Sequence, residues 1–182
     1  LWERSTEDRY GNPGTFVTAP NAYGRPTLLL AADGKTAFLT GDGASAEGDR
    51  PFVDRIALPS GEKVRLFQSA APYYEQPVAA LDGRGARWLT RRESKAEPPN
   101  YFVRDVVARA APRQLTRFAD PAPQFAGVTS QLITYTRGDG VKLSATLYLP
   151  AGYDRTRDGP LPFFLWAYPL EFRSREAASQ LV

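Results

Sequence analysis

Short apolar runs alternate with polar turns along the first two thirds of the chain, and the pattern recurs after 50 residues. Most matching positions share apolar or aromatic side chains: Phe38-Leu39-Thr40 with Trp88-Leu89-Thr90, Phe52-Val53 with Phe102-Val103, and Ile56 with Val106. Asp33-Gly34 also matches Asp82-Gly83, after a slip of one residue. This recurrence indicates an internal duplication.

Each copy of the repeat is predicted to contain four short β-strands separated by turn signals. The expected strands are residues 27–31, 36–40, 51–58 and 63–67, then 77–81, 86–91, 100–107 and 113–117. Four strands at this period are typical of a β-propeller blade, and a duplicated β-sandwich is the alternative. Because a closed ring takes about four to eight blades, we expect further chain before Leu1.

The pattern breaks at Pro121 and Pro123, where two prolines in three residues favour an extended linker. We place a domain boundary between about Asp120 and Val128. Residues 1–122 are then the C-terminal blades of a β-propeller, and residues 123–182 begin a different domain.

A β-hairpin is predicted after this boundary, over residues 131–136 and 141–149. Its second strand alternates apolar and polar residues strictly, which is typical of a half-buried antiparallel strand. The connection Gly138-Asp139-Gly140 predicts a two-residue Asp-Gly turn with positive φ at both positions. Arg137-Gly138-Asp139 also matches a cell-adhesion tripeptide, and we prefer the turn.

The apolar run at residues 163–168, framed by prolines, predicts a strand buried on both faces, as in a parallel sheet. It is far shorter than the ~20 residues that a membrane-spanning helix needs. A hairpin that leads into a buried strand is how an α/β-hydrolase sheet begins. The expected fold is therefore mainly β: a partial β-propeller followed by the first strands of an α/β-hydrolase domain.

Composition narrows the possible chemistry. The chain has 182 residues, 42% of them hydrophobic and 24% charged, a balance typical of a globular protein. It has no Cys, which excludes disulfides and thiolate chemistry, and no His, which excludes a complete Ser-His-Asp triad. It also has no Met and begins at Leu1, so we expect a piece of a longer product.

Charge and motifs exclude several other functions. The net charge is +3, and the densest basic stretch, residues 84–95, is interrupted by apolar and acidic residues, so we expect no nucleic-acid partner. We likewise expect no membrane partner, and the sequence leaves the compartment open. The pairs Asp49 with Asp54, or Glu93 with Glu97, fit glycoside hydrolysis less well than a structural role, because Glu97 is the repeat equivalent of Glu47.

Several segments carry a resemblance to a known family. Residues 131–153 resemble the entry hairpin of hydrolase domains in the prolyl oligopeptidase family of serine peptidases. The remaining segments resemble its glutamyl endopeptidase subgroup: residues 43–52, 89–94, 97–105 and 158–169, with Phe172, Ser174 and residues 177–180. The resemblance covers about residues 10–180.

The resemblance implies a β-propeller placed over an α/β-hydrolase domain, with the active site between them. It implies a serine-type endopeptidase or oligopeptidase that cleaves peptide bonds after Glu through an acyl-enzyme, with no metal or organic cofactor. Its partners would be a peptide substrate and the remainder of the same peptidase. The motif Gly-x-Ser-x-Gly is missing here, so the catalytic Ser, Asp and His lie elsewhere and this chain alone is predicted to be inactive.

Tyr168 is the one catalytic residue that the resemblance assigns to this chain. It occupies the place of a tyrosine that donates its hydroxyl to the oxyanion in family members, whereas a Tyr buried for packing is the alternative. Pro169-Leu170 follows where many relatives have Gly-Gly. Cleavage after Glu implies a cationic pocket, for which the sequence offers five candidates without choosing among them: Arg91, Arg92, Arg104, Arg173 and Arg175.

A non-catalytic β-propeller-type binding module is the alternative to the enzyme. In that case the repeat forms an interaction surface, and the C-terminal strands are an appendage without a reaction of their own.

Overall fold

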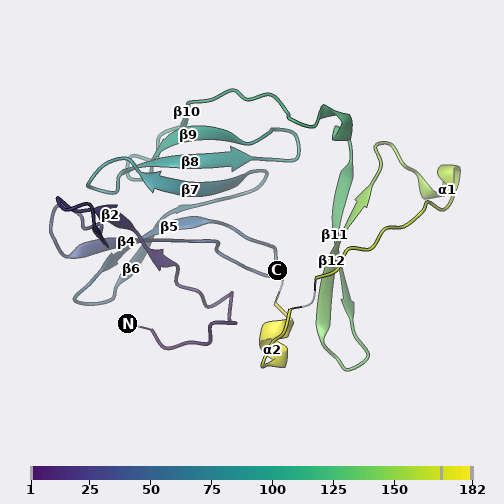
Figure 1. Ribbon diagram of the computed structural model, residues 1–182, viewed down its shortest axis with the longest axis horizontal. Coiled ribbons are helices and arrows are strands. Elements are labelled where there is room, and N and C mark those ends of the chain that lie inside the picture. Colours follow the sequence, from purple (N-terminus) through teal and green to yellow (C-terminus); the bar gives the residue numbers. More distant parts are fainter. Residues whose placement is uncertain (1, 169, 181–182) are drawn as a thin grey trace.

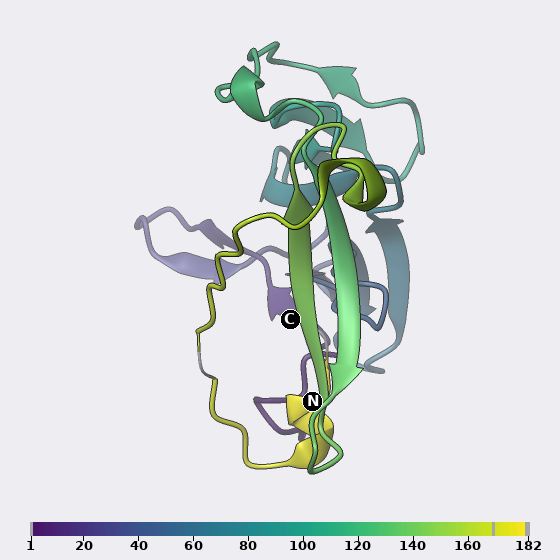
Figure 2. The same ribbon diagram turned by 90° about the vertical axis from the view of Figure 1, so that its right-hand side faces the viewer.

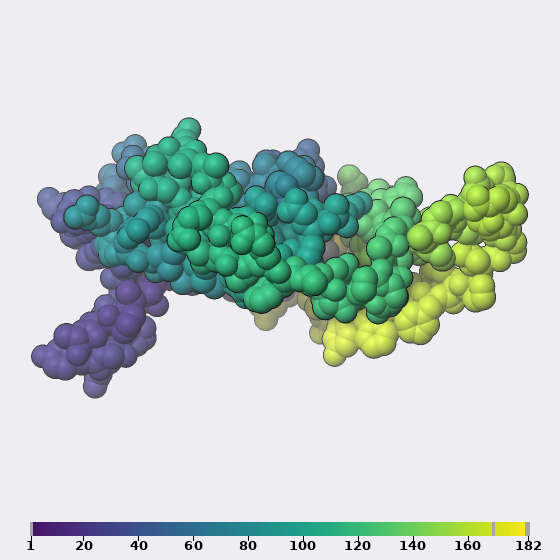
Figure 3. All heavy atoms as spheres, turned by 90° about the horizontal axis from the view of Figure 1, so that it is seen from above, coloured from purple at the N-terminus to yellow at the C-terminus, as the bar shows by residue number. Residues whose placement is uncertain are grey.

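The structure, a computed structural model, describes residues 2–168 and 170–180. Two four-stranded antiparallel sheets are followed by a long two-stranded hairpin and two helices of four residues each (Figure 1). The predicted mainly-β fold is confirmed. Seen from above, the sheets occupy one side of an elongated molecule and the C-terminal third extends from them (Figure 3).

The two sheets are built in nearly the same way. The first contains β1 (Thr15–Phe16), β4 (Thr36–Gly41), β5 (Phe52–Ala57) and β6 (Lys63–Gln68), in that order. The second contains β7 (Tyr74–Ala80), β8 (Arg87–Glu93), β9 (Asn100–Asp105) and β10 (Arg113–Gln114), in chain order. The predicted duplication of a four-stranded unit is therefore present.

The first strand of the first unit differs from the prediction. Residues 27–31 were expected beside residues 36–40, but β3 (Pro26–Leu28) pairs instead with β2 (Thr18–Pro20). Only an isolated bridge joins Leu30 to Ala37. The reason is that β1, from earlier in the chain, already pairs with the end of β4.

The alignment of the repeat also needs a correction. Leu39 pairs with Asp54 in the first sheet, and Trp88 pairs with Arg104 in the second. When Asp54 and Arg104 are aligned at the predicted offset of 50 residues in β5 and β9, these pairings make the offset 49 residues in β4 and β8. A slip of one residue moves a side chain to the other face of a strand. Phe38 is thus not the counterpart of Trp88.

The main core lies between the two sheets and holds them together. Phe38 and Val53 of the first sheet pack against Trp88 and Val106, and all four are buried. The rings of Phe38 and Trp88 meet edge to face with centroids 6.5 Å apart, a favoured aromatic geometry. Gly85 has a φ of 65°, and a Cβ there would lie 2.2 Å from the Phe38 ring, so the contact requires glycine.

A buried ion pair sits at the same junction. The Glu75 carboxylate is 3% exposed and accepts hydrogen bonds from Arg104 Nε (2.9 Å), Arg104 Nη2 (2.7 Å) and the Thr90 hydroxyl (2.7 Å). The Arg104 guanidinium lies over the ring of Phe67, which belongs to the first sheet. The opposite charges of Glu75 and Arg104 are therefore paired with each other where the two sheets meet.

The C-terminal third begins with a short 3₁₀ helix, Pro123–Phe125, and continues into β11 (Thr129–Thr136) and β12 (Lys142–Leu149). These two strands form the predicted hairpin, with eight residue pairs in unbroken register. The remaining helices are α1 (Arg155–Asp158) and α2 (Arg175–Ala178). The division of the chain into two domains near residue 122 stays a prediction.

The hairpin turn is longer than predicted. Five residues separate the last paired positions, Thr136 and Lys142. Among the described residues of the turn only Gly140 has a positive φ, of 86°, so the two-residue turn with positive φ at Asp139 is wrong. Hydrogen bonds from Arg137 N to Val141 O and from Gly140 N to Arg137 O close the wider loop instead.

The apolar run 163–168 is not a buried strand in this structure. The segment is extended and passes around one side of the hairpin (Figure 2), and its large side chains are 70–82% exposed. A strand forms by hydrogen bonding to a neighbour, and no described strand pairs with these residues. Within the described residues, no helix is long and apolar enough to cross a membrane.

Candidate functional site

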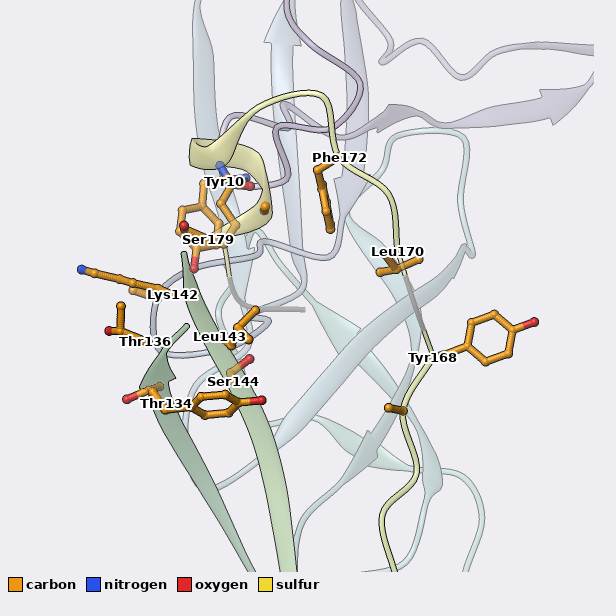
Figure 4. A pocket seen from close by; sticks show the side chains of 15 residues that line it. Tyr10, Thr134, Thr136, Lys142, Leu143, Ser144, Tyr168, Leu170, Phe172 and Ser179 are labelled. Atoms are coloured by element: carbon orange, nitrogen blue, oxygen red, sulfur yellow. Dashed lines mark hydrogen bonds between the residues drawn. The ribbon is translucent and has the colours of Figure 1, made fainter. Parts of the chain in front are cut away.

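A cavity lies where the hairpin, the extended segment, α2 and the N-terminal residues come together (Figure 4). Its volume is about 830 Å³, which is within the range of small-molecule and peptide sites. Its walls combine apolar side chains with hydroxyl and amide groups: Tyr10, Ala46, Thr134, Tyr135, Thr136, Lys142, Leu143, Ser144, Ala167, Tyr168, Leu170, Phe172, Ala178, Ser179 and Gln180. Lys142 is the single charged side chain among these described residues, so the lining carries no carboxylate.

Tyr168 lies at the edge of this cavity. It is one of the lining residues, while its ring points away from the other lining side chains and is 82% exposed (Figure 4). The alternative of a tyrosine buried for packing is therefore not what the structure shows. Pro169, the next residue, lies outside the described residues.

The five candidate arginines do not line the cavity. Three of them are paired with carboxylates in or beside the second sheet: Arg91 with Glu93, Arg92 with Glu97, and Arg104 with Glu75. Arg92 is also stacked between two rings, 4.1 Å from the Tyr73 centroid and 4.0 Å from that of Phe102. These contacts give the three side chains structural roles.

Of the other two arginines, Arg173 lies just before α2 and Arg175 is its first residue. Arg173 is 97% exposed and its Nε lies 3.9 Å from a Glu7 carboxylate oxygen. Arg175 lies against the hairpin turn at Gly140. Neither guanidinium faces the cavity, so the described lining offers only Lys142 as a cation.

An ion pair within the hairpin turn gives a prediction about pH. Arg137 Nε and Nη2 donate to the two carboxylate oxygens of Asp139 at 3.0 and 2.7 Å. These bonds, together with the backbone N–H of Val141, lower the pKa of Asp139 to about 2. Because the folded pKa is depressed, the pair contributes fully above the ordinary carboxyl pKa and is lost as the pH falls through about 2.

An NMR titration of the Asp139 carboxyl carbon is expected to show a midpoint near 2, and Arg137→Gln should move it back toward the ordinary 3.8. An Asp139 midpoint near 3.8 in the unsubstituted chain would contradict the pairing.

No group of three or more His, Cys, Asp or Glu side chains within residues 2–168 and 170–180 is arranged to hold a metal ion. The lining of the cavity agrees with this, because hydroxyl, amide and apolar groups are weak ligands for the common divalent ions. The chemistry that the described part of the site supports is hydrogen bonding from hydroxyl and amide groups.

Comparisons with known proteins show which proteins the chain is similar to. No family model matches it. Two curated relatives align with the whole chain: the probable chloroplastic glutamyl endopeptidases of Oryza sativa subsp. japonica, at 40% identity, and of Arabidopsis thaliana, at 38%. Both names are those of endopeptidases, so the chain is related in sequence to that class of enzyme. It is similar, more narrowly, to these two glutamyl endopeptidases, and it spans 20% of their length.

Solved structures give a weaker likeness. Two structures of the isopeptidase AtxE2, one without a ligand and one a variant with bound Astexin3-dC4, match 82% of this chain and 24% of their own. The TM-score is 0.44 and the sequence identity 14% in both cases. A likeness at this level adds nothing to the assignment from sequence.

Residues that sequence reasoning missed also meet at the cavity. Gln180 and Tyr10 lie side by side in its wall, although 170 positions separate them. Gln180 ends the segment 177–180 that carries the resemblance, but no local pattern marks its contact with Tyr10. Only the folded chain brings the N-terminal residues to α2.

Proposed function

We propose that this chain is the part of a serine-type peptidase where a β-propeller meets an α/β-hydrolase domain. The complete enzyme hydrolyses peptide bonds after Glu through an acyl-enzyme, and its catalytic Ser, Asp and His lie outside this chain. The single observation that carries the proposal is the 40% identity over the whole chain to a probable glutamyl endopeptidase.

The arrangement of the elements supports this proposal. Two four-stranded sheets in succession have the build of propeller blades, and the hairpin follows them directly. The exposed apolar segment 163–168 fits a strand whose neighbours belong to the rest of a hydrolase sheet, because a central strand of that type is apolar on both faces. The cavity between these parts has no carboxylate in its described lining, so nothing there repels an acidic peptide.

Tyr168 supplies a hydrogen bond to the reaction in this proposal. Attack on the peptide carbonyl by the catalytic serine places negative charge on the carbonyl oxygen, and the Tyr168 hydroxyl donates its hydrogen bond to that oxygen. The bond is stronger in the transition state than in the bound substrate, because the charge develops only then. The tyrosine keeps its proton throughout.

The purified 182-residue chain is expected to leave a Glu-containing peptide intact, because it has no His and no nucleophile motif. The test is a chromatographic assay of peptide cleavage, with the complete protein as the positive control. Cleavage by the isolated chain that a serine-directed phosphonate blocks would contradict the proposal.

A further inference from the structure

The N-terminal loop, residues 7–11, is fastened to the end of the described chain by the Gln180 carboxamide. Gln180 Oε1 accepts hydrogen bonds from the backbone N–H groups of Arg9 (2.8 Å) and Tyr10 (3.2 Å). Gln180 Nε2 donates to Asp8 Oδ1 at 2.8 Å. The oxygen and the nitrogen of the Gln180 side chain therefore both form hydrogen bonds to residues about 170 positions away in the sequence.

A second contact holds the other end of α2 to the same loop. The backbone N–H of Arg173, just before α2, donates to Glu7 Oε2 at 2.9 Å. The helix has only four residues, and an isolated helix of that length is not stable in water. Its place against the N-terminal loop is thus set by Glu7 at one end and by Asp8 at the other.

The N-terminal loop is in turn joined to the first sheet. Arg9 Nη2 lies 3.3 Å from Asp49 Oδ2, in the connection between β4 and β5. A chain of polar contacts thus runs from the first sheet through the loop to α2. It ends beside the cavity, because Tyr10 and Gln180 both belong to the cavity wall.

The segment that carries Tyr168 has few other attachments. Among the described residues, positions 160–168 and 170–172 make no hydrogen bond to the rest of the chain. They run from Gly159 to Arg173, where the contact with Glu7 begins. The position of Tyr168 therefore depends on where α2 is held.

We propose that Asp8 and Gln180 are positioning residues that latch α2 to the N-terminal loop. They thereby hold the segment carrying Tyr168 at the cavity, and this role in catalysis rests on the proposed function. The latch requires an amide at position 180, since one end must accept from backbone N–H groups and the other must donate to a carboxylate.

The electrostatics of Asp8 agree with this geometry. The hydrogen bond from Gln180, followed by that from the Gly11 backbone N–H, holds the pKa of Asp8 below its ordinary value. Asp8 is therefore ionised at neutral pH and acts only as an acceptor. A carboxylate at position 180 would remove the donor and bring two negative charges together.

The test exchanges the two functional groups in the complete protein. Gln180→Glu is expected to raise amide hydrogen exchange at Arg9, Tyr10 and Arg173, whose N–H groups bond across this junction, by about tenfold and to lower kcat by a similar factor, with KM nearly unchanged. Asp8→Asn added to Gln180→Glu should restore both quantities in part, because the amide at position 8 then donates to the carboxylate at position 180, while the Gly11 N–H loses the oxygen that accepted from it. Gln131→Glu, the same change at an exposed position of β11, is the control and should alter neither.

Different experimental results would overturn the latch and the proposed function. Unchanged exchange in Gln180→Glu, or a double variant no better than the single one, would overturn the latch. If the unsubstituted complete protein cleaves no peptide, the proposed function fails, while the exchange data still decide whether the two residues hold the segment.

Discussion

Replacing Tyr168 with Phe in the complete enzyme is expected to lower kcat at least about tenfold while KM stays nearly constant. The substitution removes one hydroxyl and leaves the ring in place. Loss of a donor to the oxyanion affects the transition state and leaves substrate binding almost unchanged. Steady-state kinetics on a peptide with Glu before the scissile bond measure both constants.

Tyr148→Phe is the matched control for this prediction. Tyr148 lies on β12, is 68% exposed and is not part of the described cavity wall, so its loss of a hydroxyl should leave kcat unchanged. An unchanged kcat in Tyr168→Phe would remove Tyr168 from the mechanism. Equal losses in both variants would point to a general effect on folding.

Replacing Trp88 with Ala is expected to destabilise the 182-residue chain by about 3–5 kcal/mol. Trp88 is 1% exposed and packs between the two sheets against Phe38. Its indole N–H also donates to the Gly85 carbonyl at 2.8 Å, so the substitution leaves a cavity and an unpaired carbonyl together. Urea unfolding followed by circular dichroism measures the loss.

Tyr23→Ala removes a large aromatic side chain that is 88% exposed, and it should change the free energy of unfolding by less than about 0.5 kcal/mol. A loss for Trp88→Ala no greater than that for Tyr23→Ala would show that the two sheets do not share a core.

The strands that were predicted well are those whose signal is local. The alternation of Leu143, Ala145 and Leu147 with polar neighbours fixed the second hairpin strand within one residue of its observed start. The strand expected at residues 63–67 is likewise β6, Lys63–Gln68. In both cases the side-chain period of two and the flanking turn residues are enough to place the strand.

The features that were missed depend on partners distant in the sequence. The hydrophobicity of residues 163–168 indicates a need for burial, but it does not supply a neighbouring strand. Apolar side chains occur at both Phe38 and Leu39, so similarity alone could not show which of them corresponds to Trp88; the strand pairing makes it Leu39 when β5 and β9 keep the offset of 50 residues. The contact of Gln180 with Asp8 spans 172 positions and has no local signature.

The most direct measurement is the reaction of the complete protein with a serine-directed fluorophosphonate, followed by assay on two peptides that differ only by Glu or Gln before the scissile bond. A glutamyl peptidase whose nucleophile lies outside this chain should be labelled at a serine beyond these 182 residues and should lose its cleavage after Glu on labelling. A complete protein that is neither labelled nor able to cleave the Glu peptide would contradict that assignment.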